Sequence, residues 1–141
     1  MIVLDTNVLS EVSKSEPEEK VIAWLDAQDV PTLCTTTITQ AEIFLGIALM
    51  PDGKRKKHLA VRYEELFSKH VFGRLFPFDA AAAKMYAGIC AARRTSGKPI
   101  SVIDAQIAAI CLARGAILAT RNTKDFAGVG LECVNPWEYA P

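Results

Sequence analysis

Short runs of apolar and β-branched residues alternate along this chain with longer segments whose apolar residues recur every three or four positions. The short runs have the length and composition of β-strands, and the periodic segments those of amphipathic helices. Strands are predicted over residues 2–4, 32–36, 75–78, 116–120 and 131–134. The first run is apolar throughout, which is typical of a central parallel strand that is buried on both faces.

Helices are predicted between these strands, over residues 8–14, 16–28, 41–49, 54–67, 80–94 and 102–113. Residues 15–18 and 39–42 have the form of capping boxes, and Asp79 and Ser101 are predicted N-caps. The helices over 41–49 and 54–67 are expected to form a hairpin. Because strands and helices alternate, we predict an α/β fold, a three-layer α/β/α sandwich around a central parallel sheet of four to five strands.

Length and composition favour a single domain over residues 1–141, because a chain of this size with 50% hydrophobic content can bury one sizeable core. Sixteen basic and sixteen acidic residues cancel, so the net charge favours no class of partner. The four cysteines form no C-x-x-C pair and indicate neither a zinc site nor a redox motif. No signal peptide or membrane-length apolar run is seen, so we expect a cytoplasmic protein without membrane contact.

Acidic and amide side chains recur where the predicted strands end. Asp5 follows the first strand, Glu42 and Asp104 are predicted in the first turns of helices, and Asn122 and Asp125 follow the fourth strand. Carboxyl ends of parallel strands share one sheet edge, so these side chains are expected to meet there. Each has an ordinary alternative as a turn or capping residue, and it is their coincidence at one edge that favours a functional site.

Several carboxylates held together repel one another, and a cation among them keeps them ionised. Ligand sets made of oxygen atoms favour Mg²⁺, with Mn²⁺ as an alternative. His58 and His70 are expected to be surface or packing residues, so the sequence supplies no imidazole base, and it contains no phosphate-binding glycine motif. The chemistry that remains is metal-assisted hydrolysis.

Four blocks of sequence together resemble a PIN domain of the VapC and FitB-like toxin type: residues 2–8, the helix start at Glu42, residues 101–109 and residues 119–126. The resemblance covers nearly the whole chain. It implies a Mg²⁺-dependent endoribonuclease, the toxin of a type II toxin-antitoxin pair, which cleaves RNA phosphodiester bonds by metal-activated water and is inhibited by a cognate antitoxin. It also implies a homodimer, or a higher heteromer with the antitoxin on operator DNA.

The resemblance carries three acidic positions over to Asp5, Glu42 and Asp104 as catalytic residues and metal ligands. The fourth position is open, because many relatives have an aspartate where this chain has Asn122, and Asp125 follows three residues later. Thr6 and Thr120 match hydroxyl positions that hold ligands or water, although helix-capping and strand-end roles are the alternative.

Basic residues must hold RNA around an acidic site. The candidates near the sheet edge are Arg93, Arg94, Lys98, Arg121 and Lys124. The basic run over residues 54–57 is a further candidate, although such a run is commonly a solvated helix face. The alternative function is a binding protein that forms a heteromer with its antitoxin and represses its own operon, with weak or vestigial nuclease activity.

Overall fold

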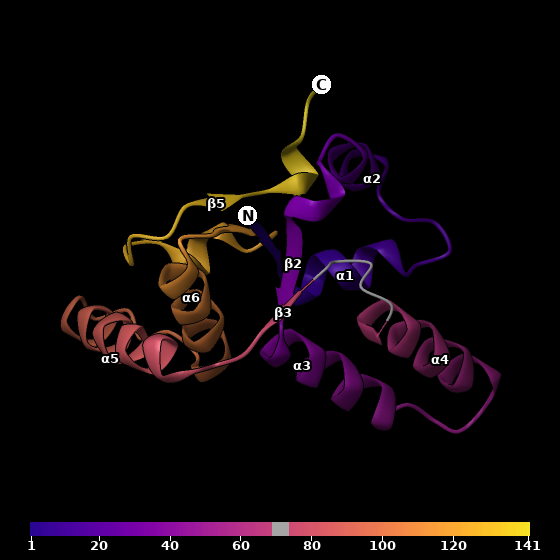
Figure 1. Ribbon diagram of the computed structural model, residues 1–141, viewed down its shortest axis with the longest axis horizontal. Helices are drawn as coiled ribbons and strands as arrows, with labels where there is room; N and C mark the ends of the chain where they lie inside the picture. Colours follow the sequence, from indigo (N-terminus) through magenta and orange to yellow (C-terminus); the bar gives the residue numbers. More distant parts are fainter. Residues whose placement is uncertain (69–73) are drawn as a thin grey trace.

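The computed structural model describes residues 1–68 and 74–141, and its centre is a parallel sheet with the strand order β3-β2-β1-β4-β5 (Figure 1). All four strand pairings are parallel. The prediction of a buried, central first strand is confirmed, as is the parallel sheet. The strands are β1 (Ile2–Leu4), β2 (Leu33–Thr36), β3 (Leu75–Phe76), β4 (Ile117–Ala119) and β5 (Cys133–Val134).

Helices cover both faces of the sheet, as the predicted three-layer sandwich requires. Within the described residues they are α1 (Thr6–Val12), α2 (Glu19–Asp26), α3 (Thr37–Ala48), α4 (Lys54–Ser68), α5 (Ala80–Thr95) and α6 (Val102–Arg114). Three short 3₁₀ helices are η1 (Val30–Thr32), η2 (Thr123–Phe126) and η3 (Pro136–Glu138). Figure 1 shows α5 and α6 on one side of the sheet and α1, α3 and α4 on the other.

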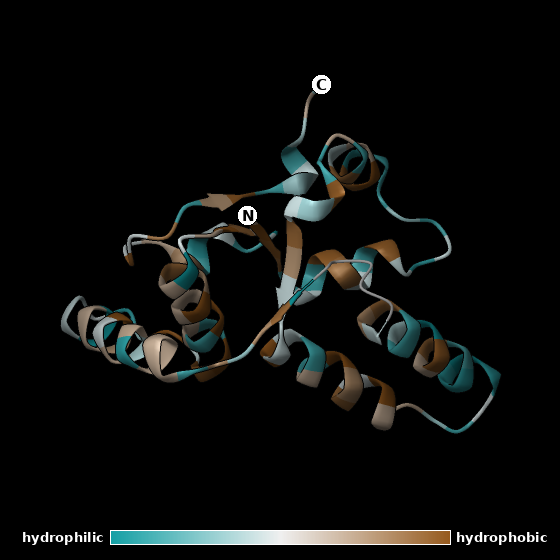
Figure 2. Cartoon of the chain, in the orientation of Figure 1, coloured by the Kyte–Doolittle hydropathy of each residue, from teal (hydrophilic) through white to brown (hydrophobic). Residues whose placement is uncertain are grey.

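The core has two halves because neighbouring strand residues face opposite sides of the sheet. Val3 packs in the half that contains α5 and α6, whereas Leu4 packs in the half that contains α1 to α4. Both side chains are fully buried. Figure 2 shows hydrophobic residues along β2 and β5, and hydrophilic residues over much of α4. Burial of β1 on both faces therefore fixes the position of the residue that follows it, Asp5.

Three predicted helix starts are wrong. Helix α1 begins at Thr6, two residues earlier than predicted, because the Asp5 carboxylate caps it by accepting a hydrogen bond from Thr6 N–H. Helix α3 begins at Thr37, four residues earlier than predicted, because the Thr36 hydroxyl accepts a hydrogen bond from the backbone N–H of Thr39 at 3.0 Å. Glu42 consequently lies in the second turn of α3 and not in the first. Helix α2 begins at Glu19 without a side-chain cap, since the N–H of Glu18 donates to the Glu11 carboxylate at 3.2 Å.

The predicted caps of α5 and α6 are confirmed. The Asp79 carboxylate caps α5 by accepting from Ala82 N–H, the Ser101 hydroxyl caps α6, and Gly115 ends α6 with a positive φ of 64°. Helices α3 and α4 form the predicted hairpin, with the rings of Phe44 and Phe67 5.5 Å apart. In the part of the chain that the structure describes, no helix is long and apolar enough to cross a membrane. His70 lies outside the described residues.

Candidate active site

Asp5 stands directly after the central strand, with 5% of its surface exposed. Its Oδ1 accepts a hydrogen bond from the backbone N–H of Thr6 at 2.8 Å, and its Oδ2 accepts one from the Thr120 hydroxyl at 2.7 Å. Burial raises the pKa of this carboxyl above its ordinary value, and these hydrogen bonds lower it only in part. The negative charges of Asp104 and Glu42 raise the pKa of Asp5 further.

Asn7 connects the two segments that carry Asp5 and Thr120. Its Nδ2 donates to Asp5 Oδ2 at 3.3 Å and to Thr120 Oγ1 at 3.2 Å, and its Oδ1 accepts from the N–H of Arg121 at 3.2 Å. The Thr120 hydroxyl also accepts from the N–H of Asn122 at 3.1 Å. The loop after β4 is thus held against the end of β1 by a polar network.

Glu42 reaches this edge from α3. The Thr6 hydroxyl donates to Glu42 Oε1 at 2.6 Å and lies 3.4 Å from the hydroxyl of Thr39. Thr39 is fully buried in the first turn of α3, the position predicted for Glu42. The side chain of Glu42 is half-buried, and its carboxylate is held by a residue of α1.

Asp104 lies in the first turn of α6, as predicted, and its N–H donates to the Ser101 hydroxyl at 3.2 Å. Burial raises the pKa of the Asp104 carboxyl, and hydrogen bonding of that carboxyl to the Ser101 side chain opposes the shift. The negative charge of Asp125 raises the pKa of Asp104 further, while the positive charge of Arg93 lowers it. Asp104 and Asp125 therefore lie within electrostatic range of each other.

The ambiguous fourth position falls on an exposed segment. Asn122 precedes η2 and makes no side-chain capping hydrogen bond, whereas Asp125 lies within η2. Arg93 braces this segment, because its guanidinium donates to the carbonyls of Asp125 at 2.8 Å and Ala127 at 3.2 Å. Of the two candidates, Asp125 is the one whose charge acts on Asp104.

The acidic side chains at this edge are widely spaced in the described residues. There, no group of three or more His, Cys, Asp or Glu side chains is close enough together to hold an ion. The chemistry of the donors nevertheless fits a hard cation, because the side chains at this edge offer carboxylate, amide and hydroxyl oxygens. Within residues 1–68 and 74–141 no basic side chain forms an ion pair with Asp5, Glu42 or Asp104, so their mutual repulsion has no ion-pair compensation. By the chemistry of their oxygen donors, and not by their spacing, these residues suit Mg²⁺ or Mn²⁺.

The predicted RNA-binding residues differ in whether their side chains already contact other parts of the chain. Arg93 is engaged with backbone carbonyls, including that of Lys98 at 2.6 Å. The guanidinium of Arg121 lies over the ring of Trp137, 5.2 Å from its centroid. Arg121 and Lys124 line a cavity of about 270 Å³ beside Asn122 and Asp125, and Arg94 is exposed on α5.

Sequence reasoning gave no role to Asn7 and misplaced the start of the helix that carries Glu42. Asn7 could have been found from its position two residues after the strand-end aspartate, where its amide can bond both neighbouring segments. The Thr36-x-x-Thr39 spacing was the signal for the true start of α3. Asn7 holds the segment that carries Asp5, and Thr36 caps the helix that carries Glu42.

Comparison with known proteins agrees with this geometry. The family model for the PIN domain matches residues 2–131. The chain is 47% identical to the VapC ribonuclease Y4jK of Sinorhizobium fredii, over 99% of this chain and 100% of that protein. It is 40% identical to the toxin FitB of Neisseria gonorrhoeae, over 97% of this chain and 99% of that protein.

A structure of FitAB bound to a DNA fragment superposes with a TM-score of 0.89 at 38% identity, covering 100% of this chain and 99% of that one. The predicted family is therefore confirmed by sequence over nearly the whole chain and by the arrangement of the strands and helices. This chain belongs to the PIN domain family, among its VapC- and FitB-type toxins.

Proposed function

We propose that this protein is a Mg²⁺-dependent endoribonuclease, the toxin of a toxin-antitoxin pair, acting on RNA in the cytoplasm. The observation that carries the proposal is the convergence of Asp5, Glu42 and Asp104 at one sheet edge, in a chain whose relative at 47% identity is named a ribonuclease. The charges of Glu42 and Asp104 raise the pKa of the buried Asp5, and the charge of Asp125 raises that of Asp104, so a cation is favoured at that edge.

Asp5 and Asp104 would hold the metal ion, with Glu42 and Asp125 as further ligands. When bound, Mg²⁺ supplies the positive charge that activates water and offsets the charge of the phosphodiester during hydrolysis. Asp5 is oriented for this role by hydrogen bonds from Thr6 N–H and the Thr120 hydroxyl.

The remaining polar residues act by positioning. Thr6 fixes the orientation of the Glu42 carboxylate through its 2.6 Å hydrogen bond, and Asn7 holds the loop after β4 against Asp5. Arg121 and Lys124, beside the edge, bind the phosphates that flank the scissile bond. His58 lies on α4, and the carboxylates act without an imidazole base.

The function is tested by incubating the purified chain with cellular RNA, with Mg²⁺ or with EDTA, and mapping the cut ends. The wild type is expected to cut RNA only with Mg²⁺, and Asp104→Asn to lose roughly 100-fold in rate. Asp52→Asn is the matched control, since this fully exposed carboxylate lies between α3 and α4 and pairs with Lys56. Full activity of Asp104→Asn, or activity in EDTA, contradicts the proposal.

A cognate antitoxin is the proposed partner. A guanidinium is always charged and offers planar donors to carboxylates, so an antitoxin arginine that enters the site near Asp5, Glu42 and Asp104 would block it. Cells that express this chain are expected to grow again when the neighbouring gene is co-expressed. Replacing the inserted arginine of that partner with alanine is expected to restore RNA cleavage while the complex stays intact. A neighbouring gene product that neither binds nor inhibits the chain contradicts this pairing.

The quaternary proposal is a homodimer that binds operator DNA as a heteromer with the antitoxin, as the similar FitAB structure contains DNA. Operator binding by the complex together with intact RNA in the cleavage assay would favour the alternative, a repressor with vestigial nuclease activity. Mass measurement of the chain with and without its partner distinguishes the assemblies.

A further inference from the structure

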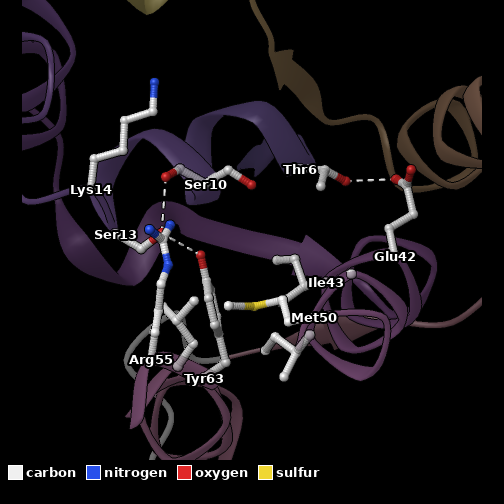
Figure 3. Close-up of a pocket in the computed structure, with 12 residues that line it drawn as sticks. Thr6, Ser10, Ser13, Lys14, Glu42, Ile43, Met50, Arg55 and Tyr63 are labelled. Atoms are coloured by element: carbon white, nitrogen blue, oxygen red, sulfur yellow. Dashed lines mark hydrogen bonds between the residues drawn. The ribbon is translucent and has the colours of Figure 1, made fainter. Parts of the chain in front are cut away.

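A groove runs from the candidate active site along the junction of α1 with α3 and α4. It consists of two cavities, of about 320 and 610 Å³, within the roughly 300–1,000 Å³ range of ligand sites. Ser13, Lys14, Arg55 and Leu59 line both cavities, so the two are continuous. Figure 3 shows Thr6 and Glu42 at one end of the first cavity and Ser13, Lys14 and Arg55 at the other. We call the two cavities together the α1–α4 groove.

The far end of the α1–α4 groove is basic. Arg55, His58 and Arg62 all line the second cavity, and their i, i+3 and i+7 spacing places them on one face of α4. Lys14 faces them from the segment after α1, and Glu16 is the acidic residue that lines the same cavity. Cationic side chains therefore outnumber acidic ones along this part of the groove.

The two arginines are available for a ligand. Arg55 and Arg62 are exposed, and neither forms an ion pair or hydrogen bond with another residue that the structure describes. Lys14, by contrast, pairs with Glu11 at 3.0 Å. The hydroxyls of Ser10 and Ser13 add hydrogen-bonding groups to the first cavity.

The same basic run provides an internal comparison. Lys54 and Lys57 belong to α4 and are exposed, but they line neither cavity of the groove. Lys56 is already bound to the carboxylate of Asp52 and to the carbonyl of Ala48. Sequence alone treats residues 54–57 as one charge run, whereas the structure separates Arg55 from its neighbours.

We propose that the α1–α4 groove binds the phosphate backbone of the substrate RNA on the Glu42 side of the scissile bond, with Arg55 and Arg62 as its phosphate ligands. This inference rests on the proposed ribonuclease function. A strand that crosses a carboxylate site is repelled there, so it needs cations on both sides. Arg121 and Lys124 provide them on the Asn122 side, and Arg55 and Arg62 on the other.

A polyanion fits this groove better than an acidic peptide does. The cations form a stripe along a helix face, which matches a regularly repeated phosphate charge. Near the active site, the apolar side chains of Ile43, Ile47 and Met50 line the first cavity and give an unstacked base a surface to pack on. Hydroxyls beside them can bond ribose.

The test measures the affinity of the partner-free chain for a fluorescein-labelled single-stranded RNA in EDTA over a series of salt concentrations. Each phosphate contact to a single strand contributes about 0.7 to the slope of log affinity against log salt. The pair Arg55→Ala/Arg62→Ala is therefore expected to lower the slope by about 1.4, which is twice 0.7. The control pair Lys54→Ala/Lys57→Ala removes the same charge from the same helix and is expected to leave the slope unchanged.

Four outcomes overturn the inference. If the arginine pair and the lysine pair lose the same amount of salt slope, the effect is one of general charge. If the arginine pair loses none while the wild type still cuts RNA, the groove does not bind RNA, but the ribonuclease function is unaffected. A slope that is unchanged for RNA while poly-glutamate binding depends on the arginine pair assigns the groove to an acidic peptide. A wild type that neither binds nor cuts RNA removes the proposed function as well. Thermal unfolding of each variant checks that these exposed substitutions leave the fold intact.

Discussion

Asp125 and Asn122 pose the sharpest question at the scale of single residues. Both lie on the exposed segment after β4, but the negative charge of Asp125 raises the pKa of Asp104, so Asp125 lies within electrostatic range of Asp104. A carboxylate is a stronger ligand for Mg²⁺ than a neutral amide. We therefore propose Asp125 rather than Asn122 as the fourth metal ligand.

Asp125→Ala is accordingly expected to lower the rate of RNA cleavage by roughly 10-fold or more, and Asn122→Ala by less. The backbone carbonyl of Asp125 that binds Arg93 is retained in the variant, so the brace on this segment should persist. Initial cleavage rates at saturating Mg²⁺, compared between variants of matched thermal stability, give the answer. If Asp125→Ala cuts RNA at the wild-type rate, the Asp125 side chain has only a structural role in the 3₁₀ helix η2.

Glu11 shows how one buried carboxylate links two helices. It accepts from the Lys14 ammonium at 3.0 Å and from the N–H of Glu18, which immediately precedes α2. The hydrogen bond with Lys14 is the main reason that the pKa of Glu11 lies below its ordinary value of 4.5. A lowered folded-state pKa means that the charged form stabilises the fold above the ordinary value and that this stability is lost as the pH falls through the lowered pKa.

Glu11→Gln is expected to reduce the free energy of unfolding by about 1 kcal/mol at neutral pH, and the difference from wild type should shrink as the solution becomes more acidic than pH 4.5. Urea unfolding at several pH values measures it. Glu16→Gln, an exposed neighbour in the same segment, is the control. A difference that stays constant down to strongly acidic pH would show that Glu11 acts by packing and not by charge.

At the scale of elements, hydrophobic pattern predicted the order and type of every strand and of the α-helices, because burial of β1 on both faces and the helical stripes leave clear periodicities. Element starts were harder to predict. Thr36 and Thr39 can each cap a helix, and the sequence does not show that Thr36 already ends a strand whose backbone exposes its hydroxyl to Thr39 N–H. The start of α2 depends on Glu11, which precedes it by eight residues and contacts it only in the folded chain.

For the candidate site, too, features set by local sequence were predicted and contacts between distant elements were not. The strand-end position of Asp5 and the first-turn position of Asp104 follow from local sequence and were predicted correctly. Contacts between elements, such as Thr6 with Glu42 and Asn7 with Thr120, connect residues far apart in the chain and appear only in the structure.

For the whole molecule, the fold assembles repelling carboxylates without an ion-pair partner in the described residues, which should cost stability when no metal is bound. Removal of one charge is then expected to hold or raise the melting temperature of the metal-free protein. Metal binding to the folded state raises it in the wild type. If the protein is a metal-dependent ribonuclease, the side chains whose repulsion lowers the stability of the metal-free protein are the same ones that bind the metal.

The most direct measurement of this central claim is a Mn²⁺ titration of the purified chain, monitored by calorimetry or electron paramagnetic resonance. The wild type is expected to bind Mn²⁺, and Asp5→Asn and Asp104→Asn are each expected to weaken binding by about 10- to 100-fold, while Asp52→Asn binds as the wild type does. Mn²⁺ affinities that are equal in the wild type and in both site variants would contradict it.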